Sequence, residues 1–226
     1  MNEDAIVSLE TLVHGRRSVR GFRPDPVPDA LIRRAFALAQ QAPSNCNTQP
    51  WIVHVVSGDV AERMRAALDA DAAAGRRPEP DFPFTGAYRD LYRDRQIDSA
   101  KALFAALGIT RDDQAGRQAS MRRNYRFFDA PHAAFLFLPE PFGPREAADC
   151  GMFAQTLMLA LTALGVDSCA QGALGHYAAT VRDVLGVPDG HRLLFGIAFG
   201  WQDADHPANA ARVGRASLDE AIVFHA

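Results

Sequence analysis

Three arginines crowd a short stretch near the N-terminus of this 226-residue chain. Arg16, Arg17 and Arg20 fall within five residues, with Ser18 between them. Guanidinium groups this close repel one another unless water solvates them or they share an anion, and the planar donor fork of arginine suits a phosphate. The stretch therefore predicts either a phosphate site or a solvated basic connector, and taken alone it favours the connector.

A second polar stretch runs from Ala42 to Trp51, with the sequence APSNCNTQPW. Pro43 and Pro50 disfavour a regular helix or strand, and the amide and hydroxyl side chains between them tend to bond backbone groups or a ligand. The stretch lies between a predicted helix and an apolar run, 52–56, that is typical of a strand. Binding groups often lie on such loops, but a capped helix-to-strand connection explains the stretch equally well.

Familiar catalytic and metal-binding patterns are missing from the sequence. It has no GxGxxG turn, no GxxxxGKS loop, no HExxH and no GxSxG elbow. The seven histidines are dispersed, and the three cysteines, Cys46, Cys150 and Cys169, indicate neither a disulfide framework nor a thiol nucleophile. We therefore expect no metal site, and we expect any chemistry to depend on a cofactor.

The composition is typical of a globular protein, with 48% hydrophobic and 23% charged residues. A formal charge of -3 is too small to indicate binding to nucleic acid or to an anionic membrane surface. The first ten residues are acidic and unlike a signal peptide, and the longest apolar stretch, 152–166, is too short to span a bilayer. We expect a soluble cytoplasmic protein without nucleic-acid or membrane partners.

Hydrophobic periodicity predicts the elements around these stretches. Helices are predicted over 6–15, 30–41, 61–74, 147–164 and 178–185, and strands over 52–57, 133–138, 193–199 and 221–224. Asp29 is predicted to cap the second helix, and the 147–164 helix is apolar nearly all round, which suits a core or a subunit interface. Small residues follow that helix from Ser168 to Gly175, where the backbone could approach a flat ligand, although a flexible connector is equally consistent.

Residues 75–123 lack this regularity. They contain proline-rich segments and a charged helix around 88–95, and they suit either a lid over a binding site or a peripheral helical hairpin. No repeat or linker divides the chain. We expect one α+β domain, residues 1–226, in which helices wrap a central sheet and a variable, lid-like insertion spans about 75–123.

Together these features resemble the nitroreductase family of FMN-dependent flavoenzymes. The resemblance rests on RRSVRGF at 16–22, PVP before a helix, the polar stretch at 42–51, and a late helix followed by LGVDS, a small-residue loop, a buried strand, Gly200 and a basic tail. It covers 1–57 and 124–226 and fades across 75–123. It implies a nitroreductase-like fold with a mostly antiparallel sheet, in an intertwined homodimer with FMN at the subunit interface.

The resemblance also implies roles for individual residues. Those expected to hold FMN are Arg16, Arg17, Ser18 and Arg20 at the phosphate and pyrimidine edge, Arg212 and Arg215 at the phosphate, Pro43, Ser44, Asn45, Asn47 and Gln49 from the partner subunit, Asn124 and Arg126 near flavin N1–O2, and Ala170, Gln171, Gly172 and Ala173 along the isoalloxazine ring. Two positions depart from the family pattern, because Val213 replaces a basic residue of many members and Gly172 an acidic residue of some. Phosphate binding should survive the first change, since three N-terminal arginines remain, and a backbone N–H contact to N5 needs no particular side chain.

The implied function is hydride transfer from NADH or NADPH, through flavin N5, to nitroaromatics, quinones or similar flat acceptors by a ping-pong mechanism. No side chain is expected to be catalytic. Phe84, Tyr88 and Tyr92 in the insertion could stack on a small aromatic substrate, with core packing as their competing role. The alternatives are a non-catalytic flavin-binding protein or sensor, a flavin-dependent dehalogenase or flavin-fragmenting enzyme on the same scaffold, and a structural dimer that has lost its cofactor.

Overall fold

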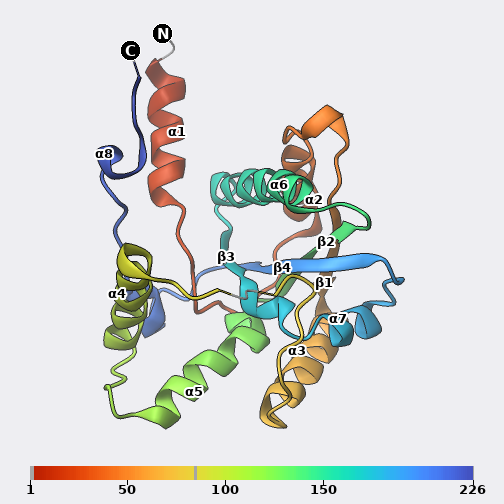
Figure 1. Ribbon diagram of the computed structural model, residues 1–226, viewed down its shortest axis with the longest axis vertical. Coiled ribbons are helices and arrows are strands. Elements are labelled where there is room, and N and C mark those ends of the chain that lie inside the picture. The colour runs from red at the N-terminus through yellow and green to blue at the C-terminus, as the bar shows by residue number, and fades with distance from the viewer. Residues whose placement is uncertain (1–2, 84–85, 226) are drawn as a thin grey trace.

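A four-stranded antiparallel sheet forms the centre of the computed structural model, which describes residues 3–83 and 86–225 (Figure 1). Its strands are β1 (Ile52–Ser57), β2 (His132–Pro139), β3 (Asp167–Gln171) and β4 (His191–Gly200), in the spatial order β1-β2-β4-β3. Strand β2 is buried from His132 to Leu138, as expected for a continuous apolar run in the middle of a sheet. This sheet positions the segments that form the candidate site.

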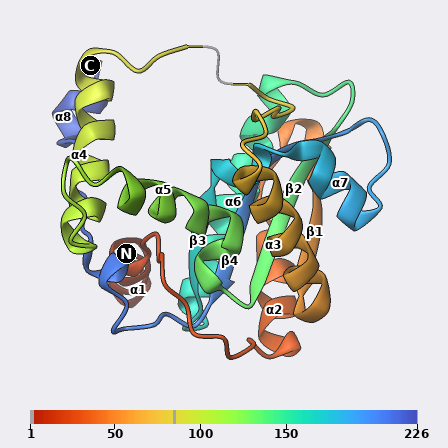
Figure 2. The ribbon, with the colours of Figure 1, turned by 90° about the horizontal axis from the view of Figure 1, so that it is seen from below.

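Helices cover both faces of the sheet (Figures 1 and 2). The α-helices are α1 (Glu3–Gly15), α2 (Asp29–Ala39), α3 (Gly58–Ala73), α4 (Asp90–Ala106), α5 (Gln114–Arg122), α6 (Pro144–Ala163), α7 (Ala178–Leu185) and α8 (Leu218–Ala221), and the short 3-10 helices are η1 (Asn45–Asn47), η2 (Arg123–Asp129), η3 (Gly172–Gly175) and η4 (Pro207–Ala210). Because successive strand residues point to opposite faces, Leu136 packs in the cluster with α2 and α6, and Phe135 in the cluster with α3 and α7.

Two segments extend away from this body. Helix α1 and the C-terminal segment that carries α8 both leave from the same end of the molecule (Figure 1). On α1, the side chains of Ile6, Leu9 and Val13 are 43%, 51% and 48% exposed. In the tail, Phe224 is 77% exposed. Apolar side chains gathered on projecting segments are typical of surfaces that bind another protein chain.

Most of the predicted elements are present. The helices predicted over 6–15, 30–41, 61–74, 147–164 and 178–185 correspond to α1, α2, α3, α6 and α7, and three of the predicted strands to β1, β2 and β4. The α+β class with an antiparallel sheet is therefore confirmed. The predicted cap of α2 is wrong by one residue: Pro28 is the N-cap, and Asp29, inside the first turn, pairs with Arg33 at 2.6 Å.

Two segments were predicted as the wrong kind of structure. Residues 168–171 were predicted as part of a small-residue loop, but they belong to β3, which pairs with β4. Residues 221–224 were predicted as a strand, but α8 ends at Ala221 and no strand follows it in the described chain. A strand needs a hydrogen-bonded neighbour, and this tail leads away from the sheet (Figure 1).

The insertion is more regular than its sequence indicates. Helix α4 is longer than the predicted charged helix, and α5 was not predicted, because neither helix buries a residue and so neither shows a clear apolar stripe. The start of the insertion is attached to the body: Glu79 N–H donates to His176 O at 2.8 Å, and Leu193 N–H to Asp81 Oδ2 at 2.6 Å. Across the described residues, no helix is long and apolar enough to cross a membrane.

Candidate cofactor site

The N-terminal arginine stretch and the basic tail meet at one cavity of about 470 Å³. Its lining includes the guanidinium-bearing residues Arg16, Arg17, Arg20, Arg212 and Arg215, together with Ser18. Side chains about 190 residues apart in the sequence thus surround one space. Five cations at one cavity favour an anionic ligand, and a phosphate matches their donor geometry. We refer to this space as the arginine cavity.

Backbone pairing fixes the N-terminal part of this cavity. The segment 18–22 runs between β3 and the residues after β4: Val19 N–H donates to Ser168 O at 3.1 Å, and Asp203 N–H donates to Gly21 O at 3.0 Å. Gly21 is needed here, because a Cβ at this position would collide with the His206 side chain. The arginine stretch is therefore part of the folded platform and not a solvated connector.

The arginines differ in their contacts. The Arg17 guanidinium donates to Asn209 O at 2.6 Å and to Gln202 Oε1 at 2.5 Å. Burial, with Arg212 close by, lowers the pKa of Arg17. Arg17 is thus engaged by the protein itself. Gln202 and Asn209 were not predicted, because single amides in a turn carry no pattern in the sequence.

The end of β3 and the start of η3 form an accessible wall. Ala170 and Gly172 are exposed, and a Cβ on Gly172 would meet no atom within 4 Å. The buried Gln171 side chain donates through Nε2 to Asn124 O at 3.0 Å and to Asn124 Oδ1 at 3.2 Å, while its Oε1 has no hydrogen-bond partner among the described residues. Two predicted site residues, Asn124 and Gln171, are therefore in contact, and beside them the backbone is open to a flat ligand.

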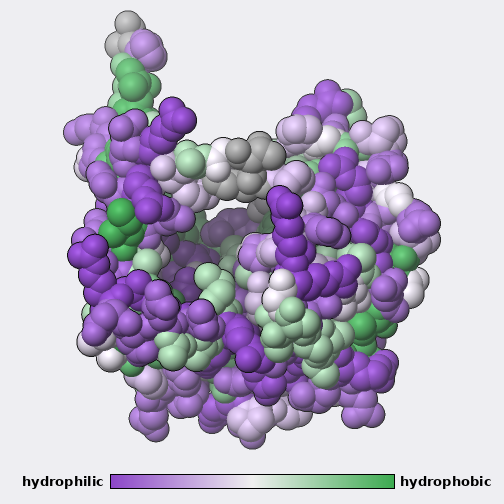
Figure 3. Space-filling model, turned by 60° about the horizontal axis from the view of Figure 1, so that its bottom comes forward, coloured by the Kyte–Doolittle hydropathy of each residue, from purple (hydrophilic) through white to green (hydrophobic). Residues whose placement is uncertain are grey.

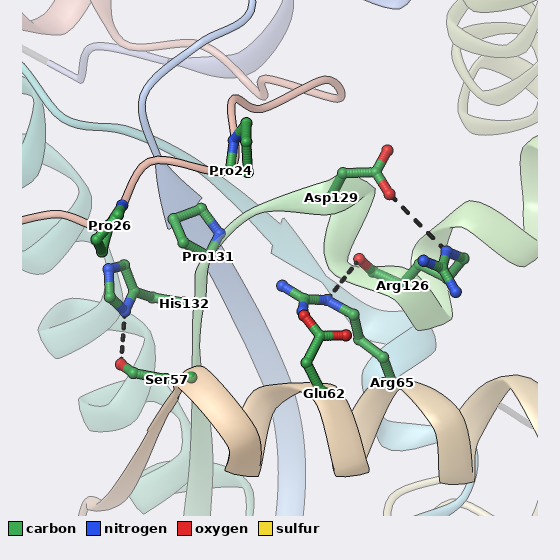
Figure 4. A pocket seen from close by; sticks show the side chains of 10 residues that line it. Pro24, Pro26, Ser57, Glu62, Arg65, Arg126, Asp129, Pro131 and His132 are labelled. Carbon is green, nitrogen blue, oxygen red and sulfur yellow. Dashed lines mark hydrogen bonds and ion pairs between the residues drawn. The ribbon is translucent and has the colours of Figure 1, made fainter.

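Arg126 is not at the arginine cavity. It lines a second cavity of about 450 Å³ with Asp129 and Arg65 (Figure 4). Three consecutive left-handed residues, at 127–129, turn the chain here, and the buried Arg65 binds carbonyl oxygens on both sides of that turn. The unpredicted Arg123 reaches toward the arginine stretch and donates to Arg20 O at 2.9 Å.

The second cavity also contains a close serine–histidine pair, Ser57 Oγ and His132 Nδ1, at 2.5 Å (Figure 4). His132 Nε2 accepts the Val27 N–H at 2.9 Å, so the hydrogen of the neutral ring lies on Nδ1 and is donated to Ser57. A general base for the serine would need the opposite arrangement. The pair is therefore structural.

The polar loop at 42–51 is well organised but lies apart from the arginine cavity of its own chain. Asn45 N–H donates to Asp149 Oδ2 at 3.1 Å, and Gln49 N–H to Ser44 Oγ at 2.9 Å. Non-glycine residues hold left-handed φ angles at Cys46 (49°), Asn47 (57°) and Gln49 (46°). The loop's remaining predicted ligand, Pro43, is exposed. Backbone strain of this kind is typical of ligand sites, although no residue of the loop lines the arginine cavity.

Of the predicted substrate residues, Tyr88 lies just before α4 and Tyr92 in its first turn. Tyr88 is 50% and Tyr92 67% exposed, so neither packs in the core. Phe84 lies outside the described residues. The molecule is hollowed on the face shown in Figure 3, where hydrophilic and weakly hydrophobic side chains border the opening.

The buried thiols are poorly suited to nucleophilic chemistry. Burial raises the pKa of Cys150 to about 12 and also raises the pKa of Cys169, so both remain protonated at neutral pH. In the described ranges, 3–83 and 86–225, no group of three or more histidine, cysteine or acidic side chains could hold a metal.

Comparison with known proteins identifies the family of this chain. The nitroreductase family model matches residues 13–201. Nitroreductase NfnB of Mycolicibacterium smegmatis is 46% identical over 98% of this chain and 94% of its own length, and nitrobenzene nitroreductase of Ectopseudomonas oleovorans is 32% identical over 96% of both.

Solved structures show the same relationship. The FMN-dependent nitroreductase NfnB from Mycobacterium smegmatis in complex with NADPH has a TM-score of 0.94 at 45% identity, covering 98% of this chain and 100% of that one. The FMN- and NADPH-dependent NfnB from Sphigopyxis sp. strain HMH has a TM-score of 0.93 at 40% identity, covering 97% and 99%. The family model matches residues 13–201 and the relatives cover nearly the whole chain, so the protein belongs to the nitroreductase family.

Proposed function

We propose that this protein is an FMN-dependent oxidoreductase that uses NADPH to reduce nitroaromatic compounds. The observation that carries the proposal is the arginine cavity, where cations from both ends of the chain meet. Relatives that are 40% to 46% identical to this chain carry the name nitroreductase, and two of their solved structures are described as FMN-dependent enzymes that bind or depend on NADPH. These relatives favour NADPH over NADH, a choice that the sequence alone leaves open.

The residues of the site fit FMN. Arg16, Arg20, Arg212 and Arg215 would neutralise a phosphate that carries close to two negative charges. The unpartnered Gln171 Oε1 offers an acceptor to a ring N–H. Bound FMN would supply the hydride chemistry, taking hydride from NADPH and passing it to the acceptor in alternate steps.

The chain itself contributes position and charge. The arginines hold the anionic end of the cofactor, and the Gln171–Asn124 contact fixes the end of β3. The open backbone at Gly172 leaves room for the ring edge. The buried thiols stay protonated and the Ser57–His132 pair is structural, so neither supplies a nucleophile. Hydride transfer through a flavin needs none.

We also propose that the protein works as a cytoplasmic homodimer with the cofactor at the subunit interface. The apolar side chains on α1 and in the tail are exposed in a single chain, and a second copy would cover them. The polar loop of residues 42–51 lies apart from the arginine cavity of its own chain, so a partner's loop could complete the site. Polar loops held by a rigid platform commonly supply such ligands.

An anaerobic titration of the FMN-supplemented protein with NADPH, and separately with NADH, tests the activity. We expect NADPH to bleach the visible flavin absorption, and nitrobenzene or 4-nitrobenzoate to restore it. A bound flavin that neither donor reduces would support a flavin-binding sensor instead. Loss of all flavin on desalting would contradict the cofactor site, and recovery of a dehalogenated product or fragmented flavin would identify a different reaction on this scaffold.

A further inference from the structure

Asn209, in η4, uses both donors of its side-chain amide and also its acceptor oxygen. It is 4% exposed. Its Oδ1 accepts the Arg20 N–H at 2.7 Å, and its Nδ2 donates to Gly21 O and to Asp203 O, both at 2.8 Å. The Arg20 N–H depends on Asn209 for its partner, whereas Gly21 O and Asp203 O also accept from Asp203 N–H and His206 N–H. The side chain therefore fixes η4 against the N-terminal arginine stretch.

The backbone oxygen of Asn209 joins the two halves of the arginine cavity. It accepts from Arg17 Nη1 at 2.6 Å and from Arg212 Nη1 at 2.7 Å. Two guanidinium groups on one oxygen repel each other, so the distance between Arg17 and Arg212 depends on where the Asn209 carbonyl lies. The hydrogen bonds of the Asn209 side chain set the location of that carbonyl.

We propose that Asn209 is a positioning residue for the phosphate end of the cofactor. It holds Arg20 and Arg212, which come from opposite ends of the chain, at one cavity, although it does not itself line that cavity. The inference rests on the proposed function, because the anion is taken to be the FMN phosphate. Without the Asn209 side chain, η4 loses its attachment to Gly21, and repulsion spreads the arginines apart.

A comparison of FMN with riboflavin tests this role, because riboflavin has the same ring and ribityl chain but no phosphate. We expect Asn209→Ala to lower FMN affinity about tenfold or more, and riboflavin affinity by less than about threefold. Asn209→Ser, whose small hydroxyl can still bond one of the three groups, should fold even if the alanine variant does not. It adds no charge beside the cavity and loses the remaining contacts, so it should lose FMN preference in the same direction.

Asp81→Ala is the matched control. This half-buried carboxylate binds Leu193 N–H at 2.6 Å and Arg182 at 2.5 Å, away from the arginine cavity. Its loss should lower stability while leaving the ratio of FMN to riboflavin affinity unchanged.

The outcomes separate the inference from the proposed function. If the wild-type protein prefers FMN and both Asn209 variants retain that preference, the positioning role is wrong. Equal losses for the two flavins, or the same change of ratio in Asp81→Ala, would show a merely structural residue and overturn the inference as well. A wild-type protein with no preference for FMN would contradict the phosphate site, and with it both proposals.

Discussion

Arg16 and Arg17 are neighbours in the chain, but only one of them is held by the protein. Arg17 bonds Asn209 and Gln202, whereas the Arg16 guanidinium makes no hydrogen bond or ion pair within the described residues. We expect Arg16→Gln to lower FMN affinity about tenfold, because a charged hydrogen bond is lost. The melting temperature of the apoprotein should not fall, because repulsion among the arginines is relieved.

Arg17→Gln should behave differently, lowering the melting temperature of the apoprotein because Asn209 O and Gln202 Oε1 lose their donor. Flavin fluorescence quenching and thermal melting of both variants measure the two effects. An equal drop in melting temperature would show that the two arginines do not have separate roles.

His132 should make the fold sensitive to acid. It is 3% exposed, and burial, aided by Arg65, lowers its pKa from 6.5 to about 4. The unfolded chain therefore binds more protons than the folded chain between these two pKa values. The stability that neutral His132 contributes is fully present above pH 6.5 and is lost as the pH falls toward 4. The loss attributable to this group is about 3 kcal/mol at most.

Urea unfolding at neutral pH and near pH 4.5 measures this dependence, and His132→Gln should reduce it. A residual slope is expected, since burial also lowers the pKa values of His176 and His54. An unchanged slope in the variant would rule His132 out as the main source.

Site residues that cluster locally could be predicted from the sequence, and those that act across the fold could not. Arg16 and Arg20 stand out because like charges are close in the chain. Asn209 and Arg123 work through contacts 189 and 103 residues away, and a lone amide or an arginine among other arginines gives no signal. Arg126 lies at a second cavity, just before three successive left-handed residues that turn the chain, and its predicted place near flavin N1–O2 stays a prediction.

The same distinction holds for elements. β2 and β4 were predictable because strands buried on both faces are continuous apolar runs. The edge strand β3 was not, since its small residues gain their conformation from β4. The tail at 221–224 has a strand-like composition but no neighbouring strand in this chain, and composition alone does not supply the hydrogen-bonding partner.

Helix α4 is the element on which substrate choice should depend. Tyr88 and Tyr92 are exposed near its start, and Arg95 links the helix to Glu220 of α8 at 3.2 Å. We expect Tyr88→Ala or Tyr92→Ala to change the relative kcat/KM for nitrobenzene and 4-nitrobenzoate while FMN stays bound. Leu91→Ala, a change on the same exposed helix turn, serves as the control. Unchanged selectivity in both tyrosine variants would remove the case for a lid.

At the scale of the whole molecule, assembly and cofactor binding should be lost together. Leu9 on α1 and Phe224 in the tail are 51% and 77% exposed in one chain, and burying a side chain of this size is worth about 2 kcal/mol. A charge at either position would have to be desolvated in an interface. We therefore expect the wild type to sediment as a dimer and the double variant Leu9→Glu/Phe224→Glu as a monomer.

The same variant should retain less FMN, because the polar loop of a partner would no longer complete the arginine cavity. Glu10→Gln, on the same helix but without new charge, should leave both mass and flavin content unchanged. Sedimentation equilibrium combined with flavin absorbance measures mass and occupancy in one sample. A monomeric variant with full flavin occupancy would place all the FMN ligands within one chain, and the loop at residues 42–51 would then have no part in binding.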